Sequence, residues 1–448
     1  MKALEKPPNW EDAFKKDENP FLKLFMDKEV MDFVNRMNDK YYYWDELKYR
    51  PLPKHISREM GWIFVKISRV SQRRLLKLSS TKGKLFGYWL PDSVLRELQF
   101  IDQNATGHIL VDEPTIGRLD KDRYIISSLM EEAIASSLLE GAATTRKKAK
   151  EMLRDGRKPE TKGERMIQNN YSTMLRIKDR IKENLTIELL CEIQASITQG
   201  TLEDQTASGR LRRSDEDVHV VDMTGGSILH TPPAADDLVF RLQQLCDFAN
   251  ELQKYTFLHP VIKGIILHFW LAYEHPFVDG NGRTARALFY WFLLKNKYWL
   301  IEFLPISRII LKAPARYKMS FLYSEQDDED ITYFINFNLR AFRLSLEDLR
   351  KYIAKKQKEL RDASRFLKKF PSLNHRQQEL INHAIRHPGS NYTLAHHASI
   401  HGIVYQTART DLFHLVKLRL LRSGKVGRTY FFTPNEDLAR KLRGRRFR

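Results

Sequence analysis

The chain has 448 residues, of which 42% are hydrophobic and 11% are aromatic. This length favours two or three domains, and this composition excludes a disordered chain. Lys and Arg outnumber Asp and Glu by 75 to 56, and the net charge of +19 predicts an anionic partner, for which nucleotides, nucleic acids and acidic protein surfaces all qualify. No apolar run approaches the roughly 18 residues of a membrane span, so no membrane partner is expected.

The start of the chain and its cysteines predict the compartment. The first ten residues, MKALEKPPNW, lack the apolar core of a signal peptide. The two cysteines, Cys191 and Cys246, each stand alone in an apolar, helix-like context. Buried free thiols are typical of a reducing compartment, so a cytoplasmic protein is expected.

The N-terminal part, about residues 1–115, mixes helical patterns with one strand-like apolar run at residues 62–67. A helix is expected after Pro91, to about residue 102, with Asp92 or Ser93 as its N-cap. No pattern in this part indicates a function.

Helical periodicity dominates the central part of the chain. Apolar residues recur at spacings of three to five from Tyr124 to about Lys150, and Gly141 interrupts them as a C-cap would. Residues 209–221 alternate between polar and apolar, as a hairpin does. Further helices are expected at residues 163–181, 187–198, 233–252, 260–273, 281–295, 315–324 and 329–340.

A charged helix is expected at residues 344–369, and Pro371 marks a domain break. Beyond it, the pattern predicts helices at residues 375–387, 392–401 and 404–418, then two strands around a turn at 423–427. This order resembles a winged helix-turn-helix, whose third helix would carry Gln406, Thr407, Arg409 and Thr410. From residue 371 onward there are 14 Lys and Arg against 4 Asp and Glu, so this part could bind DNA, although many winged helices bind protein.

One run of twelve residues, HPFVDGNGRTAR at 275–286, concentrates the polar chemistry. Gly280 and Gly282 permit a tight turn where a helix begins, and the free backbone N–H groups there favour an anion. Arg283 and Arg286 share one helix face, and their planar guanidinium groups suit phosphate oxygens. Asn281 could donate its amide to a phosphate.

Two further residues of this run complete a reactive site. A carboxylate at Asp279, one residue before the turn, can hold Mg²⁺ through a phosphate oxygen. The imidazole of His275, with an ordinary pKa near 6.5, can take a proton from an attacking hydroxyl at neutral pH. The glycines also half-match a dinucleotide fingerprint, but that motif follows a strand, and residues 265–271 are typical of a helix.

The full string His-Pro-Phe-x-Asp-Gly-Asn-Gly-Arg-x-x-Arg resembles the signature of the Fic family of nucleotidyltransferases, and the resemblance extends over about residues 120–340. It implies a mainly α fold, with a Fic helical core, a small β-hairpin flap, an α-rich N-terminal domain and a C-terminal winged helix-turn-helix. The expected parts are an N-terminal domain at 1–115, a Fic domain at 116–342, a charged helical linker at 343–370 and a winged-helix-like domain at 371–448.

The resemblance also implies an activity, which is the transfer of AMP from Mg-ATP to a Ser, Thr or Tyr hydroxyl of a protein, itself included. In the family, the histidine deprotonates that hydroxyl and the acidic residue holds Mg²⁺, here His275 and Asp279. The remaining motif residues would bind the phosphates, with Arg286 on the γ-phosphate: Gly280, Asn281, Gly282, Arg283 and Arg286.

A second motif of the family, Ser/Thr-x-x-x-Glu-Gly/Asn, fits Ser-Ser-Leu-Leu-Glu-Gly at residues 136–141. Ser136 and Glu140 would share one face of a helix at 124–141, which Gly141 would end. In the family, this glutamate pairs with the last motif arginine, here Arg286, and replaces its γ-phosphate contact. The chain therefore resembles the self-inhibited members, although an ordinary surface glutamate is the alternative.

The residues that match the family's flap are expected to dock the target segment by adding a strand, although a plain surface hairpin is the alternative. They are Gly209, Arg210, Leu211, Arg212, Val218, His219 and Val220. His268, before the motif, is expected to be a packed core histidine. The histidines at 383, 387, 396, 397 and 401 lack the cysteine or glutamate partners of a zinc site.

Two other functions stay open at this point. The same site, with Glu140 positioning a water molecule, could instead remove AMP from a modified protein. Alternatively, the Fic core could sense a nucleotide within a DNA-binding regulator. The sequence leaves open the target protein, the direction of the reaction, the role of residues 1–115 and whether the chain forms a homodimer, as related proteins often do.

Overall fold

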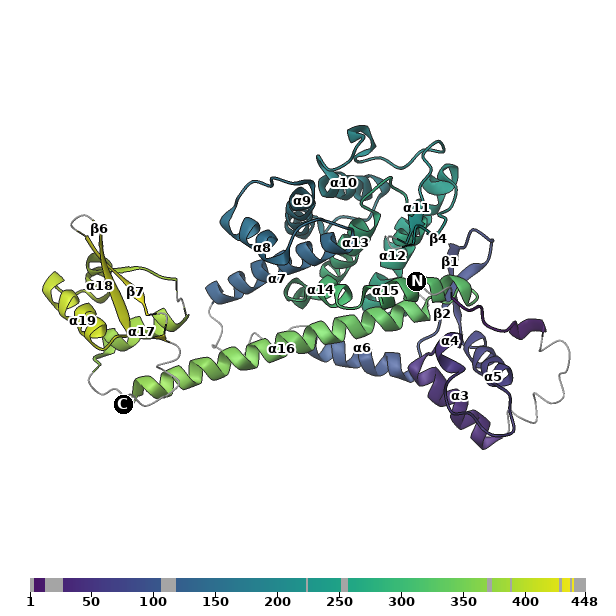
Figure 1. Ribbon diagram of the computed structural model, residues 1–448, viewed down its shortest axis with the longest axis horizontal. Helices are drawn as coiled ribbons and strands as arrows, with labels where there is room; N and C mark the ends of the chain where they lie inside the picture. Colours follow the sequence, from purple (N-terminus) through teal and green to yellow (C-terminus); the bar gives the residue numbers. More distant parts are fainter. Residues whose placement is uncertain are drawn as a thin grey trace. The chain divides into compact units, whose positions relative to one another are not determined.

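The computed structural model describes residues 4–12, 27–105, 118–222, 225–250, 257–368, 373–386, 389–426, 429–435 and 437–438. The chain divides into two compact units, Met1–Glu347 and Asp348–Arg448. Their described residues are mainly helical, with small antiparallel sheets, as expected (Figure 1). None of the helices among these residues has both the length and the apolar character needed to cross a membrane.

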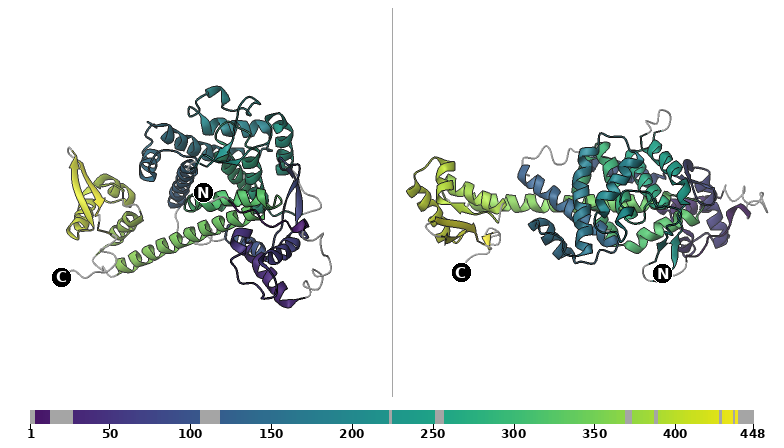
Figure 2. Two further views of the ribbon diagram at one scale, coloured as in Figure 1. Left: turned by 45° about the vertical axis from the view of Figure 1, so that its right-hand side comes forward. Right: turned by 90° about the horizontal axis from the view of Figure 1, so that it is seen from above.

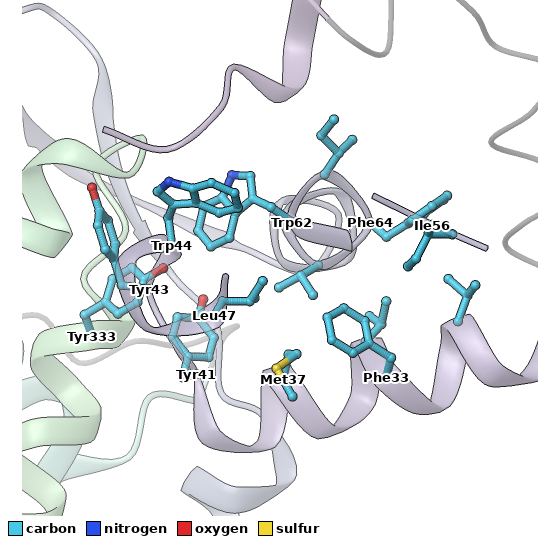
Figure 3. Packing of buried hydrophobic residues seen from close by; sticks show 14 residues of the cluster. Phe33, Met37, Tyr41, Tyr43, Trp44, Leu47, Ile56, Trp62, Phe64 and Tyr333 are labelled. Atoms are coloured by element: carbon cyan, nitrogen blue, oxygen red, sulfur yellow. The ribbon is translucent and has the colours of Figure 1, made fainter. Parts of the chain in front are cut away.

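The first unit begins with a set of helices and one hairpin, built around an aromatic core. Phe33, Trp62 and Tyr333 point into this core from three different helices (Figure 3). The elements are α3 (Lys28–Lys40), α4 (Trp44–Leu47), α5 (Arg58–Val70), β1 (Arg74–Ser79), β2 (Leu85–Tyr88) and α6 (Asp92–Ala105).

Two expectations for this region are wrong. Residues 62–67 lie within α5 and do not form a strand. A short, mostly apolar run has no period that separates a buried strand from a buried helix. The Ser57 side chain caps this helix by accepting from the Met60 N–H. The helix after Pro91 exists, but the Pro91 carbonyl accepts from the Leu95 N–H at 3.2 Å, so Asp92 lies inside the helix.

The middle of the first unit is a bundle of helices around α12 and α13, which pack against each other and are buried along most of their length (Figure 1, Figure 2). The turn between these two helices carries the twelve-residue motif. The elements are α7 (Arg118–Leu139), α8 (Arg146–Asp155), α9 (Lys162–Arg176), α10 (Ile187–Thr198), α11 (Leu238–Asn250), α12 (Pro260–Glu274), α13 (Asn281–Lys295), α14 (Ile306–Leu311) and α15 (Pro314–Gln326).

The hairpin is displaced from its expected place. Residues 209–219 form no strand, and the antiparallel pair is β3 (Val220–Val221) with β4 (Ile228–His230). The segment at residues 209–219 folds back on itself, because the Arg210 guanidinium pairs with the Glu216 carboxylate at 2.6 Å. The same carboxylate also accepts from the Arg213 N–H, so local contacts satisfy this segment without a partner strand.

The helices expected at 329–340 and 344–369 are one helix, α16 (Thr332–Lys368), and residue 369 lies outside the described residues. Residues 341–343, Ala-Phe-Arg, contain no glycine or proline that would break it. The division between the two units falls within this helix.

The second unit has its own apolar core, which includes Leu380, Leu412 and Phe432. The expected helix at 392–401 begins two residues late, because Tyr392 and Thr393 pair with β7 and the Thr393 side chain caps α18. Pro371, Gly427, Arg428 and residues 440–448 lie outside the described residues. The elements are α17 (His375–Arg386), β5 (Tyr392–Thr393), α18 (Leu394–His401), α19 (Tyr405–Lys417), β6 (Leu421–Val426) and β7 (Thr429–Pro434), with sheet order β5-β7-β6.

Candidate active site

His275 ends α12 in the left-handed conformation, with φ of 46°. Its Nδ1 lies 3.2 Å from the Ala272 carbonyl oxygen. Since that oxygen can only accept, Nδ1 carries the hydrogen and Nε2 keeps a free lone pair. Burial lowers the pKa of His275 to about 4, against the opposing effect of the Ala272 carbonyl. The imidazole is therefore neutral at physiological pH and able to accept a proton.

The turn into α13 is tight and held by its own side chains. Gly280 has φ of 87°, and a Cβ there would lie 2.8 Å from the Thr198 Cγ2. The Asn281 amide donates to the Phe277 carbonyl at 2.7 Å and accepts from the Phe277 N–H at 2.9 Å. This side chain therefore fixes the loop backbone, which differs from the phosphate contact expected of it.

Arg283 is fully buried in the first turn of α13. Its Nη1 donates to the Ile197 carbonyl at 3.3 Å, but its Nε and Nη2 have no hydrogen-bond partner among the described residues. The Asp279 carboxylate, at 3.6 Å from Nη2, is 46% exposed. Burial lowers the pKa of Arg283, and a buried cation with unused donors is costly. This arrangement suits an anionic ligand, which would supply the missing acceptors.

Arg286 contacts two residues of the second motif, Ser136 in α7 and Glu140 just after that helix. Its Nε donates to the Ser136 Oγ at 2.8 Å, and its Nη2 donates to the Ser136 carbonyl at 2.9 Å and to the Glu140 Oε1 at 2.8 Å. Gly141 follows with φ of 84°, where the helix has ended. Burial alone would raise the pKa of Glu140, but Arg286 and then Arg283 outweigh it and lower that pKa. Glu140 is therefore an anion.

The Glu140 carboxylate also lies directly over the start of α13. A Cβ at Gly282 would be 2.2 Å from the Glu140 Oε1. The first N–H groups of a helix have no partner within that helix, and they favour negative charge. Glu140 therefore occupies space where the helix start would bind an anion.

Two residues whose role was not predicted hold the motif loop. Arg212 donates from Nε to the His275 carbonyl and from its backbone N–H to the Pro276 carbonyl, both at 2.9 Å. Gln194 of α10 donates from Nε2 to the Asp279 carbonyl at 3.0 Å. Arg212 was expected to dock a target, but it is buried and committed to this loop. No local pattern around Gln194 indicates its contact, because the two segments are 85 residues apart.

The other expected flap residues are spread along the loop and the hairpin. The Gly209 N–H donates to the Gln194 Oε1 at 2.6 Å, and Arg210 pairs with Glu216 as described above. Leu211 and Val218 are half-buried, and His219 lies 2.9 Å from Asp217. Val220, in β3, is the member of this set that lines the cavity beside His275.

That cavity has a volume of about 270 Å³. Its lining includes four residues of the two motifs, Glu140, His275, Gly282 and Arg286. The hairpin and α15 supply apolar side chains, which are Val220, Val221, Leu229, Phe321 and Leu322. The lining also includes the polar residues Tyr317, Lys318, His230 and Glu325. The sequence did not identify the α15 residues, because only tertiary packing brings that helix to the motif.

His268 has the position of a core histidine, as expected. It is 2% exposed, and its Nε2 lies 2.8 Å from the Tyr317 hydroxyl. Burial, and then the charge of Arg286, lower the pKa of His268 to about 3. It is therefore neutral and supports Tyr317 at the cavity wall.

A buried neutral imidazole, a helix start and a cavity of about 270 Å³ lie together here, and this arrangement suits a phosphorylated ligand. Residues 184–293 match the family model described as the Fic/DOC family. The Drosophila willistoni protein named Protein adenylyltransferase Fic is 30% identical over 156 residues, which are 35% of this chain and 27% of that protein. The protein of the same name from Aedes aegypti is 31% identical over 134 residues, which are 30% of this chain and 23% of that protein.

The matched segments thus span about a quarter of the length of these relatives. The solved structure of a Fic family protein from Desulfovibrio desulfuricans G20 has a TM-score of 0.50 at 18% identity, covering 76% of this chain and 94% of that chain. This likeness is one of fold. The chain therefore contains a Fic domain, which residues 184–293 match.

Proposed function

We propose that the chain is a protein adenylyltransferase that moves AMP from ATP onto a Ser, Thr or Tyr hydroxyl of a protein. One observation carries the proposal: the free Nε2 of His275, the start of α13 and Arg283 with its unused donors belong to the same turn between α12 and α13. The names of the relatives, Protein adenylyltransferase Fic, support it.

The chemistry follows from these groups. The target hydroxyl oxygen bonds to the α-phosphorus of ATP, the bond from that phosphorus to the bridging oxygen breaks, and pyrophosphate leaves. The hydroxyl proton passes to the His275 Nε2. The backbone N–H groups at the start of α13, with Arg283, stabilise the charge on the phosphate oxygens.

Magnesium fits this site through a single carboxylate. Among the described residues there is no group of three or more side chains that could hold a metal ion by themselves. Asp279, exposed and one residue before the turn, would hold Mg²⁺ together with phosphate oxygens and water, and the ion would neutralise phosphate charge. We expect Asp279→Ala to remove the Mg²⁺ dependence of transfer, and full Mg²⁺-dependent activity in that variant would contradict the assignment.

We propose that Glu140 restrains the reaction. Its carboxylate takes one donor of Arg286 and the space above Gly282, so a nucleotide whose γ-phosphate needs Arg286 must displace it. The reverse reaction, with Glu140 positioning a water molecule that removes AMP, uses the same groups. Turnover of an AMP-modified target protein would favour that direction.

The first experiment is intact mass after incubation with Mg-ATP, on the full chain and on Glu140→Gly. We expect a gain of one adenylyl mass mainly in the variant, since removing the carboxylate frees Arg286. Adding His275→Ala to the variant should abolish the gain and is the matched control. The proposal fails if the variant adds AMP neither to itself nor to any protein of a cell lysate supplied with labelled ATP.

We propose a winged helix-turn-helix for the second unit, with DNA as its partner. Tyr405, Gln406, Arg409 and Thr410 are exposed on α19, which supports an interaction through this helix. A gel shift with the full chain, weakening steeply as salt rises, is the expected result. Binding that does not respond to salt would contradict it. The homodimer and the cytoplasmic location stay predictions.

A further inference from the structure

The residue before His275 is tied to the N-terminal hairpin β1–β2 through one arginine. Glu274, the last residue of α12, accepts two hydrogen bonds from Arg241 of α11, from Nε at 2.6 Å and from Nη2 at 3.0 Å. The same guanidinium donates to the Ser79 Oγ at 3.2 Å and to the Ser79 carbonyl at 2.5 Å. Ser79 is the last residue of β1. Arg241 therefore connects the end of α12 to the N-terminal hairpin.

The hairpin also contacts the last two turns of α12 directly. The Tyr273 hydroxyl accepts a hydrogen bond of 2.9 Å from the N–H of Thr81, which lies in the turn between β1 and β2. Phe86 of β2 is fully buried and meets the rings of Phe269 and Tyr273 edge to face, with centroid distances of 5.3 Å and 4.9 Å. Aromatic pairs of this geometry add to the stability that burial supplies. Polar and apolar contacts thus fix the same helix end.

The stability of α12 does not explain why Glu274 is an acidic residue. Its side chain is 0% exposed, at a helix end whose free carbonyl groups disfavour another negative charge. Burial raises the pKa of Glu274, and pairing with Arg241 opposes that effect. An apolar side chain could fill such a site without any partner, and replacing a buried ion pair in this way is often neutral or stabilising. Departures from local preference of this kind are typical of functional sites.

The backbone of His275 needs support from its neighbours. Its φ of 46° is uncommon for a residue with a Cβ, and such conformations persist only where surrounding contacts fix them. Arg212 holds the His275 carbonyl from one side, and Arg241 holds the preceding residue, Glu274, from the other. Position matters here, because displacing a reacting group by about 1 Å can lower a rate by about 10²-fold.

We propose that Arg241 and Glu274 are positioning residues, which hold the end of α12 against the N-terminal hairpin so that the His275 Nε2 meets the target hydroxyl. The proposal rests on the proposed function, because it takes His275 as the base. It also gives the N-terminal hairpin a part in the reaction. Within the described part of the chain, neither side chain lines the cavity beside His275, so binding of the nucleotide should not depend on them.

The test removes both charges together, as Arg241→Met with Glu274→Leu, in the full chain carrying Glu140→Gly. Neither partner is then left buried and unpaired, which favours an intact fold. We expect kcat for AMP transfer to fall by about 10–100-fold, because the base is displaced. The KM for ATP should stay within about twofold, since the lost interaction acts only on the reacting step. A melting curve checks that the variant is folded.

A second arginine–glutamate pair of the same unit provides the matched control. Arg146 donates from Nε and Nη2 to the buried Glu131 carboxylate, both at 2.6 Å, and this pair joins α8 to α7. Arg146→Met with Glu131→Leu in the same background should keep both kcat and the KM for ATP. An equal fall of kcat in the control would show that the effect is one of general stability, and it would overturn the proposal.

An unchanged kcat in the Arg241 and Glu274 variant, or a kcat and a KM for ATP that worsen together, would also overturn the proposal. If that variant does not fold, Arg241→Lys replaces it. Lysine keeps a charge opposite Glu274, but it lacks the planar group that spans Glu274 and Ser79, so kcat should still fall. An unchanged kcat in Arg241→Lys would contradict the proposal. If the Glu140→Gly parent itself transfers no AMP to any protein, the proposed function fails as well.

Discussion

In the proposed nucleotide site, the two parts of the cavity would bind by different physics. The phosphate part depends on charge and backbone: the start of α13, two buried arginines and one imidazole, all within residues 275–286. The base part depends on packing: apolar side chains from β3, β4 and α15, with one His-Glu pair at its end. The first can be built from one turn, while the second exists only when separate segments fold together. Substitutions in the two parts should therefore differ in how they affect ligand affinity and the rate of transfer.

The largest effect should come from the reacting part. In the Glu140→Gly background, His275→Ala should lower transfer by about 10²–10⁴-fold, the usual contribution of a general base. ATP affinity should hardly change, because the imidazole contacts the hydroxyl rather than the phosphates. Transfer rates and nucleotide affinity measured on the same preparation check this. Persisting transfer would remove His275 as the base.

A substitution at Gly282 tests the position of the Glu140 carboxylate. Gly282→Ala should destabilise the chain by about 1–3 kcal/mol, because its Cβ would overlap the Glu140 carboxylate. In the Glu140→Gly background, that cost should largely disappear. Denaturant unfolding of the two single variants and the double variant measures the coupling. Additive effects would mean that Glu140 does not occupy the start of α13.

A substitution at Arg283 should lower the affinity for phosphate groups without lowering the stability of the fold. Arg283→Met should lower the affinity for ATP by about tenfold, since charged hydrogen bonds are lost. The melting temperature should not fall, because the removed cation has two nitrogens without hydrogen-bond partners among the described residues. A clear drop in melting temperature would show that Arg283 is mainly structural.

Leu322→Ala is the matched change in the base part. It should lower the affinity for ATP a few-fold through lost apolar contact, yet leave the affinity for inorganic tripolyphosphate unchanged. Arg283→Met should lower the affinity for both ligands. If the two variants affect tripolyphosphate alike, the division of the cavity into two parts is wrong.

The smallest effect expected is that of pH. An imidazole with the ordinary pKa of 6.5 would lose its base form as pH falls from 8 to 5. Burial lowers the pKa of His275 to about 4, so its neutral form persists over that range and is lost only near pH 4. The transfer rate of Glu140→Gly should therefore stay nearly level from pH 8 to about pH 5, wherever the fold is intact. A rate that halves near pH 6.5 would contradict this.

The same contrast explains which features could be predicted from the sequence. The bounds of α10 and α13 follow from caps and apolar spacing. The contact of Glu140 with Arg286 follows from the resemblance, whereas the contact of Ser136 with Arg286 was not predicted. The hairpin was misplaced, because a two-residue strand carries almost no periodic signal. Glu325 and Gln194 could not be found, since their roles depend on contacts between segments far apart in the chain.

Ser136 has a consequence for how the site opens. It accepts two hydrogen bonds from Arg286, through Oγ and its carbonyl, and neither involves Glu140. The guanidinium therefore keeps its orientation when the carboxylate leaves, and a phosphate can take over a donor that is already aimed. The affinity for ATP then depends on the fraction of molecules in which Glu140 has left Arg286. If that fraction is about one in a hundred, the apparent Kd for ATP is about a hundredfold weaker than the Kd of the open form. If Glu140 restrains the reaction as proposed, a partner that draws Glu140 away would raise activity without touching the nucleotide.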